Sequence, residues 1–380
     1  MKLRLDRAAF SDTVAWAARA LPHRPTLPVL AGILLTASDR TLTAAAFDFE
    51  VSTTFEVEAE VLAPGTALVS GRLLADLSRA LPDQPVELTS DTTDTVLTCG
   101  QSQFALPHIP REDYPRLPDL PPIRGTADAA AFAAAVAQVA IVAARDDTLP
   151  VLTAIRLEIN AERLRLVATD RYRLAVRDLP WQPADPQAPE AFALVPARIL
   201  HDITKALAKA PPGDRVTIAL HSEPSGTGGL IGLRTGARQA TTRLLDSAFP
   251  NYETIFPTTY TGSATVERLP LLEAAKRIAL VADNRSPLRI TLSAGRITLD
   301  AGNSSDARGR ETLPSPFHGE PICIPANAAY LVEGINALTT PMAELSYTTA
   351  TKPAVLTGRT DNEAEHDPSY RYLFMPLRST

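Results

Sequence analysis

The pentapeptide Thr-Leu-Pro-Val-Leu occurs twice in this chain of 380 residues, at 26–30 and at 148–152. The same offset of 122 residues (148 − 26) aligns further pairs: Phe10 with Phe132, Val14 with Val136, Ile33 with Ile155, Leu35 with Leu157, Leu42 with Leu164, and Asp48 with Asp170. This register extends through a predicted helix, a turn and two strands, so it indicates a repeated domain and not only a short shared motif.

A third, weaker copy follows the first two. Its predicted first helix repeats the apolar spacing of the first copy with Leu271, Ala275 and Ile278, and the strand at 294–300 is similar to the strand at 161–167. Three copies in 380 residues give about 127 residues each, which is an ordinary domain size. No length remains for an additional catalytic domain.

Each copy is expected to be a small α+β domain. It begins with an amphipathic helix and continues with strands rich in Val, Ile, Leu and Thr. A second helix is predicted in each copy, at 70–81, 196–210 and 325–338. This order predicts helices that cover one face of mostly antiparallel sheets, in domains at 1–122, 123–252 and 253–380.

Composition predicts a cytoplasmic protein. No stretch approaches the roughly 20 uncharged apolar residues of a membrane span. The first six residues alternate like a strand and lack the apolar core of a signal peptide. Cys99 and Cys323 stand far apart in the sequence, which favours two buried thiols in a reducing compartment over a disulfide or a metal site.

The distribution of charge is more informative than its sum. The formal net charge of −6 argues against a nucleic-acid partner. Basic residues nevertheless gather on predicted helices. On one of them, Arg198, His201, Lys205 and Lys209 follow spacings that place them on a single face. Solvated helix faces explain this pattern, and so does one surface that meets phosphate.

A search for catalytic motifs finds none. The six histidines form no His-x-x-x-His pair, no Cys-x-x-Cys spacing occurs, and both the Gly-x-Ser-x-Gly and Gly-x-x-x-x-Gly-Lys patterns are absent. Asp146 and Asp147 are adjacent carboxylates, for which a turn or helix-end role is favoured over acid–base work. We therefore expect no enzymatic activity, no metal and no cofactor.

Four strings of this sequence resemble one known family. They are the segments at 24–30, 167–176, 249–252 and 372–378, which read RPTLPVL, VATDRYRLAV, FPNY and YLFMPLR. Each resembles the corresponding segment of the bacterial DNA polymerase III beta subunit, the sliding clamp. The strings occur in the family's order, across the whole chain and together with a threefold repeat, so the resemblance is specific.

The resemblance implies a ring. Clamps of this family are head-to-tail homodimers whose six domains encircle duplex DNA without reading its sequence, and they lend processivity to a polymerase without chemistry of their own. The domain helices then line the hole, with DNA-facing positions at Arg24, Arg72, Arg79, Arg198, Lys205, Lys209, Lys276 and Arg277. The resemblance places Phe104 and Leu106 of one protomer against Leu280 of the partner subunit. A nucleoid-associated cytoplasmic protein is implied.

The resemblance also implies a pocket for short Gln-plus-Leu/Phe peptides. The partners that carry them in this family are the replicative polymerase alpha-type subunit, the clamp loader, repair polymerases, ligase and mismatch-repair proteins. The pocket positions that match are Leu152, Thr169, Arg171, Tyr172, Arg173, Leu174, Pro250, Ile255, Pro353, Phe374, Met375, Pro376, Leu377 and Arg378.

One departure from the family leaves two functions open. Arg171-Tyr172 stands where many clamps have Gly-His, which is expected to reshape the mouth of the pocket. The chain is therefore predicted to be the housekeeping sliding clamp, or a duplicated clamp specialised for repair or for resistance to a clamp-binding inhibitor.

Overall fold

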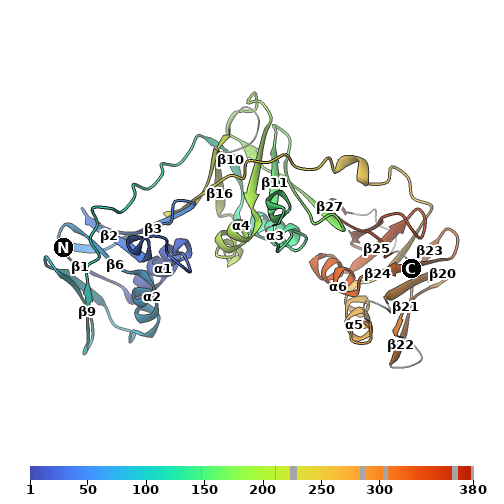
Figure 1. Ribbon diagram of the computed structural model, residues 1–380, viewed down its shortest axis with the longest axis horizontal. Helices are drawn as coiled ribbons and strands as arrows, with labels where there is room; N and C mark the ends of the chain where they lie inside the picture. The colour runs from blue at the N-terminus through green and yellow to red at the C-terminus, as the bar shows by residue number, and fades with distance from the viewer. Residues whose placement is uncertain are drawn as a thin grey trace. The chain divides into compact units, whose positions relative to one another are not determined.

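The computed structural model describes residues 1–146, 148–209, 211–222, 229–282, 287–302, 307–361 and 367–377. The chain forms two compact units, whose helices and strands are labelled in Figure 1. Unit 1 contains residues 1–130, 181–187 and 202–244, and unit 2 contains residues 131–180, 188–201 and 245–380. Each unit holds one nine-stranded sheet and one smaller sheet.

Unit 1 is built on two antiparallel sheets. The five-stranded sheet has the order β5 (Glu60–Ala63), β1 (Lys2–Leu5), β7 (Val86–Ser90), β8 (Asp94–Cys99) and β9 (Ser102–Pro107). The nine-stranded sheet has the order β14 (Gln182–Pro183), β10 (Ile123–Asp128), β16 (Arg215–Ser222), β17 (Gly229–Thr235), β18 (Arg238–Arg243), β4 (Val51–Glu58), β3 (Thr41–Phe47), β2 (Gly32–Ser38) and β6 (Gly65–Ser70).

Helices cover one face of the nine-stranded sheet in unit 1. They are α1 (Arg7–Ala17) and α2 (Gly71–Ala80), accompanied by the 3₁₀ turns η1 (Ala18–Ala20), η2 (Pro28–Ala31) and η4 (Leu207–Lys209). Helix α1 starts where the Asp6 carboxylate accepts a hydrogen bond from the Ala9 backbone nitrogen at 3.0 Å. Its apolar stripe, with Phe10 and Val14 fully buried, packs on β3 and β4 and against α2.

Unit 2 repeats this architecture. Its nine-stranded sheet has the order β15 (Ala191–Pro196), β11 (Ala154–Ile159), β12 (Leu164–Thr169), β13 (Arg173–Leu179), β27 (Asp367–Phe374), β26 (Ala354–Arg359), β25 (Met342–Tyr347), β19 (Gly262–Glu267) and β23 (Phe317–His318). The smaller sheet has the order β22 (Arg308–Pro314), β21 (Arg296–Gly302), β20 (Leu288–Ser293) and β24 (Ile322–Ala326). The helices lying wholly or mainly in unit 2 are α3 (Ala129–Ala140), α4 (Ala197–Thr204), α5 (Arg268–Ala279) and α6 (Ala328–Ala337), with 3₁₀ turns η3 (Pro150–Thr153) and η5 (Glu253–Ile255).

The second repeat contributes strands to both large sheets. In unit 1 its strand β18 pairs with β4 of the first repeat, and in unit 2 its strand β13 pairs with β27 of the third. Two side chains at equivalent repeat positions reinforce these junctions. The Trp16 indole donates to the carbonyls of Thr54 and Gln239 at 3.0 and 3.1 Å. Gln138, 122 residues later, donates to the Ala337 carbonyl at 2.8 Å.

The second helix of the middle repeat is shorter than the sequence predicts. We expected a helix over 196–210, but α4 ends at Thr204, and only a 3₁₀ turn follows at Leu207–Lys209. Pro211 and Pro212 oppose a helix that continues past them, but α4 ends well before these prolines, and nothing in the structure explains that earlier end. The other two second helices are close to prediction, at Gly71–Ala80 and Ala328–Ala337.

No helix among the described residues is long and apolar enough to cross a membrane.

Candidate functional site

A small cavity opens on one face of the nine-stranded sheet in unit 2. Its volume is about 240 Å³, and its lining comprises Leu152, Thr169, Arg171, Arg173, Leu174, Pro250, Tyr252, Ile255, Leu373 and Met375. These residues come from η3, the β12–β13 hairpin, the segment around η5, and the end of β27. The pairing of β13 with β27 joins the two repeats here, so the cavity exists only because that junction forms.

The β12–β13 turn forms one wall of the cavity. The Asp170 carboxylate accepts hydrogen bonds from the backbone nitrogens of Tyr172 and Arg173 at 3.0 and 2.9 Å. The Thr169 hydroxyl donates to the Arg173 carbonyl at 2.8 Å. Arg171 has a φ of 78°, a conformation that costs a non-glycine residue free energy. The turn is therefore held in a strained shape by its own side chains.

Arg173 ties this hairpin to helix α6. Its Nε donates to an Asp170 carboxylate oxygen at 2.9 Å, and its Nη1 forms an ion pair with Glu333. The guanidinium also lies 4.4 Å from the ring centroid of Tyr330 on the same helix. A cation held on three sides is a rigid wall element, so the polar side of the cavity is preorganised.

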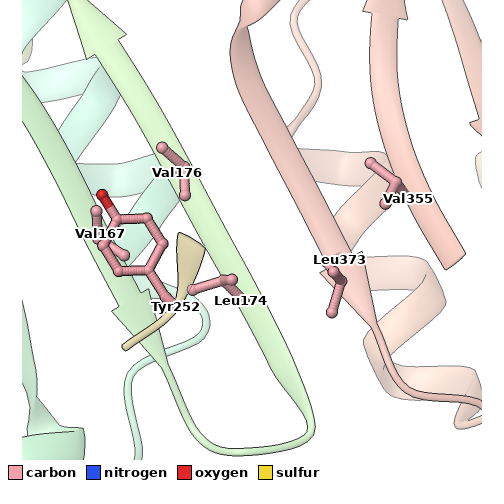
Figure 2. Packing of buried hydrophobic residues seen from close by; sticks show 6 residues of the cluster. All are labelled: Val167, Leu174, Val176, Tyr252, Val355 and Leu373. Atoms are coloured by element: carbon pink, nitrogen blue, oxygen red, sulfur yellow. The ribbon is translucent and has the colours of Figure 1, made fainter. Parts of the chain in front are cut away.

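The segment before η5 forms the opposite wall. Tyr252 is only 4% exposed and packs in a cluster with Val167, Leu174 and Val176 (Figure 2). Its hydroxyl donates to a Glu158 carboxylate oxygen at 3.0 Å, and burial raises its pKa above the ordinary value. Leu373 of β27 and Val355 of β26 belong to the same cluster. The cavity thus has an apolar floor between two hydrogen-bonded walls, which suits an amphipathic peptide or small ligand.

Eight of the fourteen predicted pocket residues lie around this cavity: Leu152, Thr169, Arg171, Arg173, Leu174, Pro250, Ile255 and Met375. Tyr172 is 61% exposed beside it, and Phe374 is fully buried, because successive side chains of β27 point to opposite faces. Among the described residues, Pro353, Pro376 and Leu377 do not line it, and Arg378 lies outside the described part of the chain.

Two lining residues were missed from the sequence. The alternation of Tyr372, Leu373 and Phe374 could have identified Leu373, since only alternate residues of a strand share a face. Tyr252 stands in the Phe-Pro-Asn-Tyr string and reads as a linker residue until the sheet beneath it is known.

Most of the predicted DNA-facing side chains are exposed. Arg24, Arg198 and Lys205 have no ion pair among the described residues. The others on helices carry partners: Arg72 donates to the Pro22 carbonyl, Arg79 pairs with Asp76, Lys276 with Glu273, and Arg277 with Glu311. The side chain of Lys209 lies outside the described part. Lys205 follows α4 in a turn and is not within a continuous helix with Arg198.

The three predicted seam residues differ in exposure. Leu280, at the end of α5, is 85% exposed, and Phe104, on β9, is 36% exposed. Leu106 is 1% exposed within unit 1, so it belongs to that unit's own core. Strand β9 is an edge strand of its sheet, and its outer backbone groups are available for pairing.

In the part of the chain that the structure describes, no group of three His, Cys, Asp or Glu side chains could hold a metal ion.

Comparison with known proteins identifies the family. Models of the N-terminal, central and C-terminal domains of the DNA polymerase III beta subunit match residues 1–118, 126–251 and 253–377. A beta sliding clamp of Streptomyces coelicolor is 48% identical over 378 residues, covering 100% of this chain and 99% of the relative. The beta sliding clamp homolog GriR of Streptomyces muensis is 41% identical with the same coverage.

Solved structures agree with the family models. The DNA polymerase III subunit beta from Pseudomonas aeruginosa is 25% identical, with a TM-score of 0.88, and each chain covers 100% of the other. The chain therefore belongs to the DNA polymerase III beta subunit family, the sliding clamps, a family of non-catalytic processivity factors. The predicted family and the predicted threefold α+β organisation are confirmed.

Proposed function

We propose that this protein is a DNA sliding clamp, which encircles duplex DNA and tethers the replicative polymerase and other replication and repair proteins to it. The observation that carries the proposal is the family match in all three copies along the whole chain. The fold supplies two features that this function needs: a cavity that can hold part of a peptide, and helices with exposed basic side chains.

The proposed active form is a closed head-to-tail homodimer. Leu280 supports it, because an apolar side chain that is 85% exposed gains free energy when a partner covers it. Strand β9, an edge strand that carries Phe104, offers the complementary surface. A contact between different surfaces of two identical chains is heterologous, and two such contacts close a ring.

The proposed contact with DNA is electrostatic and independent of sequence. Arg24, Arg198 and Lys205 would meet phosphates directly, since no carboxylate among the described residues neutralises them. Arg79 and Lys276 are paired with neighbouring acids, which weakens their attraction for phosphate. Such loose contacts depend on salt and permit sliding, while the ring topology retains the protein on DNA.

The proposed partner site is the cavity of unit 2. We assign it to short Gln-plus-Leu/Phe peptides of the polymerase alpha-type subunit, the clamp loader, repair polymerases, ligase and mismatch-repair proteins. Apolar side chains would enter between Leu174 and Leu373, and Arg173 would orient polar groups at the rim. The protein would then act at the nucleoid.

The alternative is a duplicated clamp with an altered pocket. The observation that favours it is Arg171 at the cavity edge, followed by the exposed Tyr172, two large side chains that would narrow the entrance. Similarity to the GriR homolog is lower than to the Streptomyces coelicolor clamp, at 41% against 48% identity. Replacement of the resident clamp gene by this one separates the two: growth supports the housekeeping function, and failure to grow supports specialisation.

The decisive experiment is retention on circular DNA. The purified protein is loaded by a clamp loader on a nicked plasmid, and retention is measured before and after one double-strand cut. A topological ring stays on the circle and leaves the linear product. With a control clamp confirming that the loader works, release of the protein from the intact circle would contradict the ring. Retention after cutting would indicate direct DNA binding instead.

A further inference from the structure

A second, larger cavity adjoins the proposed peptide pocket in unit 2. Its volume is about 530 Å³, and it lies between strands β11 and β15 and the segment from Phe249 to Glu253. Pro250 and Tyr252 line both cavities. A ligand in the smaller cavity therefore has the larger one as its immediate neighbour.

The floor of this cavity is a connected hydrogen-bond network. Glu158 accepts from Arg156 Nε at 2.7 Å and from the Tyr252 hydroxyl at 3.0 Å. Behind Tyr252, Arg165 makes a two-point contact with Asp178 at 2.6 and 2.8 Å, and this carboxylate raises the pKa of Arg165. Arg165 Nη1 also donates to the Tyr252 hydroxyl at 3.5 Å. Together these bonds join three strands to the covering segment, so the cavity is a fixed feature of the fold.

The walls combine aromatic and polar surface. The Arg156 guanidinium lies 4.5 Å from the ring centroid of Phe192 and 5.8 Å from that of Phe249. Phe192 remains 37% exposed, so its ring offers apolar area to a ligand. At the rim, Arg163 is half-buried and has no ion pair among the described residues, and the amide of Asn251 is available for backbone hydrogen bonds.

We propose that this cavity, which we call the flank pocket, binds the residues that flank the core motif in a partner peptide. This inference rests on the proposed peptide-binding function of the smaller cavity. The shared residues Pro250 and Tyr252 make the two cavities direct neighbours. Six extended residues span about 20 Å, which is enough to leave one cavity and cross the next.

The flank pocket accounts for recognition beyond the core motif. Once the core is held, the flank is confined near the second cavity at a high effective concentration, so a contact that would be weak alone adds measurably to affinity. The favoured flank is extended and carries an apolar side chain that packs on the Phe192 ring. Its backbone would meet Asn251, and Arg163 would donate hydrogen bonds to a carbonyl or carboxylate of the flank.

Peptide titration tests the proposal. The probes are a synthetic core peptide with a Gln-plus-Leu/Phe motif, and the same core extended by six residues at one end or the other. Each extension is made in an alternating Leu-Ser version and a Gly-Ser version. We expect one Leu-Ser peptide to bind about five-fold more tightly than its Gly-Ser counterpart. The Phe192→Ser variant should reduce this ratio to about one.

The control is Leu62→Ser, which removes an apolar side chain of unit 1 that is more exposed than Phe192, at 60% against 37%, and should leave the ratio unchanged. Because the readout is a ratio within each protein, a general loss of pocket affinity in Phe192→Ser does not imitate the expected result. Equal binding of all extended peptides, or an unchanged ratio in Phe192→Ser, would overturn the flank pocket alone. Failure of the core peptide to bind the wild-type protein would overturn the peptide-binding function and the flank pocket together.

Discussion

Arg171 shows how one residue can be placed by a turn and still shape a pocket. Its φ of 78° lies in the left-handed region, where the side chain of an L-residue crowds the following carbonyl. Hydrogen bonds on either side hold it there: its own nitrogen donates to the Thr169 hydroxyl at 3.2 Å, and Asp170 accepts from the next two nitrogens. The strained conformation persists because these hydrogen bonds together fix the turn. The turn in this way keeps the Arg171 guanidinium at the edge of the cavity.

Substitution Arg171→Gly is expected to relieve this strain. Glycine adopts positive φ without the steric cost, so the free energy of unfolding should rise by about 1 kcal/mol. The wider entrance should also admit bulkier peptides. Urea titration checks the stability. The neighbouring Tyr172→Gly serves as control, since Tyr172 has no positive φ. The free energy of unfolding of this variant should fall by about 0.5–1 kcal/mol. A lower free energy of unfolding in both variants would show that Arg171 is not strained.

At the scale of elements, the exposed basic side chains fall into two groups: those paired with a carboxylate and those without such a partner among the described residues. Arg277 makes a two-point contact with Glu311 on β22, with both distances 2.6 Å, and this carboxylate raises the pKa of Arg277. Arg198 on α4 and Lys205 just after it have no such partner among the described residues. Helix position alone therefore does not decide which cations are available to phosphate, because the neighbouring strands contribute acids.

The double substitution Arg198→Glu with Lys205→Glu should weaken DNA binding and its salt dependence. Each lost phosphate contact lowers the slope of log affinity against log salt by about 0.9, so the pair should lower it by about 1.8. Fluorescence anisotropy with labelled duplex at several salt concentrations measures the slope. Arg111→Glu with Lys352→Glu changes the net charge equally at two exposed sites outside the predicted set. Equal slopes for the two double variants would remove the α4 region from the DNA interface.

At the scale of the whole molecule, the repeats are joined by sheets and not by linkers alone. Both nine-stranded sheets cross a repeat junction, at β18–β4 and at β13–β27. In unit 1 the buried Ser52 and Thr241 hydroxyls lie 2.6 Å apart across the junction. Each of the sheets is open and ends in two edge strands, and β9 is one of these edges. An exposed edge strand can pair with another chain, so β9 is a suitable surface for the proposed seam with a second copy.

Leu280→Asp is expected to shift the protein from dimer to monomer. A carboxylate in a buried seam loses its hydration, and the apolar contact is lost as well. Sedimentation equilibrium measures the dissociation constant, and retention on circular plasmid should fall with it. Leu269→Asp on the same helix, α5, changes a residue that is 59% exposed and outside the proposed seam. If Leu280→Asp dimerises as tightly as Leu269→Asp, the proposed seam is wrong.

Buried tyrosines predict a loss of stability at alkaline pH. Burial raises the pKa of Tyr114 to about 12, and burial also raises the pKa of Tyr370 and Tyr372. Above about pH 10 the unfolded chain ionises these phenols while the folded chain keeps them protonated. The unfolded state then binds fewer protons, so the free energy of unfolding falls by about 1.4 kcal/mol per pH unit for each phenol. Below about pH 10 these phenols are protonated in both states, so their full contribution to the free energy of unfolding is present.

Urea unfolding followed by circular dichroism between about pH 8 and pH 11 measures this slope. The substitution Tyr370→Phe removes one of the buried phenols. The free energy of unfolding should therefore fall less steeply with pH in this variant, by the contribution of one phenol. Tyr172→Phe is the control, because Tyr172 is 61% exposed and not buried as Tyr370 is. A slope that Tyr370→Phe leaves unchanged would mean that this phenol does not limit alkaline stability.

The sequence by itself determined the threefold repeat, the kinds of element in each copy and the family. These properties follow from local periodicity and from short sequence motifs, so they can be predicted without knowing which strands pair. The helices at 70–81 and 325–338 were predicted to within a few residues for this reason. The strings also led to most of the residues that line the cavity.

Only the tertiary structure decided which faces are covered. Leu106 and Phe374 lie in strands whose alternation is visible in the sequence, but alternation does not say which face meets a core. Tyr252 enters the cavity wall because β12 and β13 lie beneath it, and Leu373 because β27 pairs with β13. Pairing between strands almost two hundred residues apart depends on free sheet edges and complementary surfaces, which no local pattern encodes.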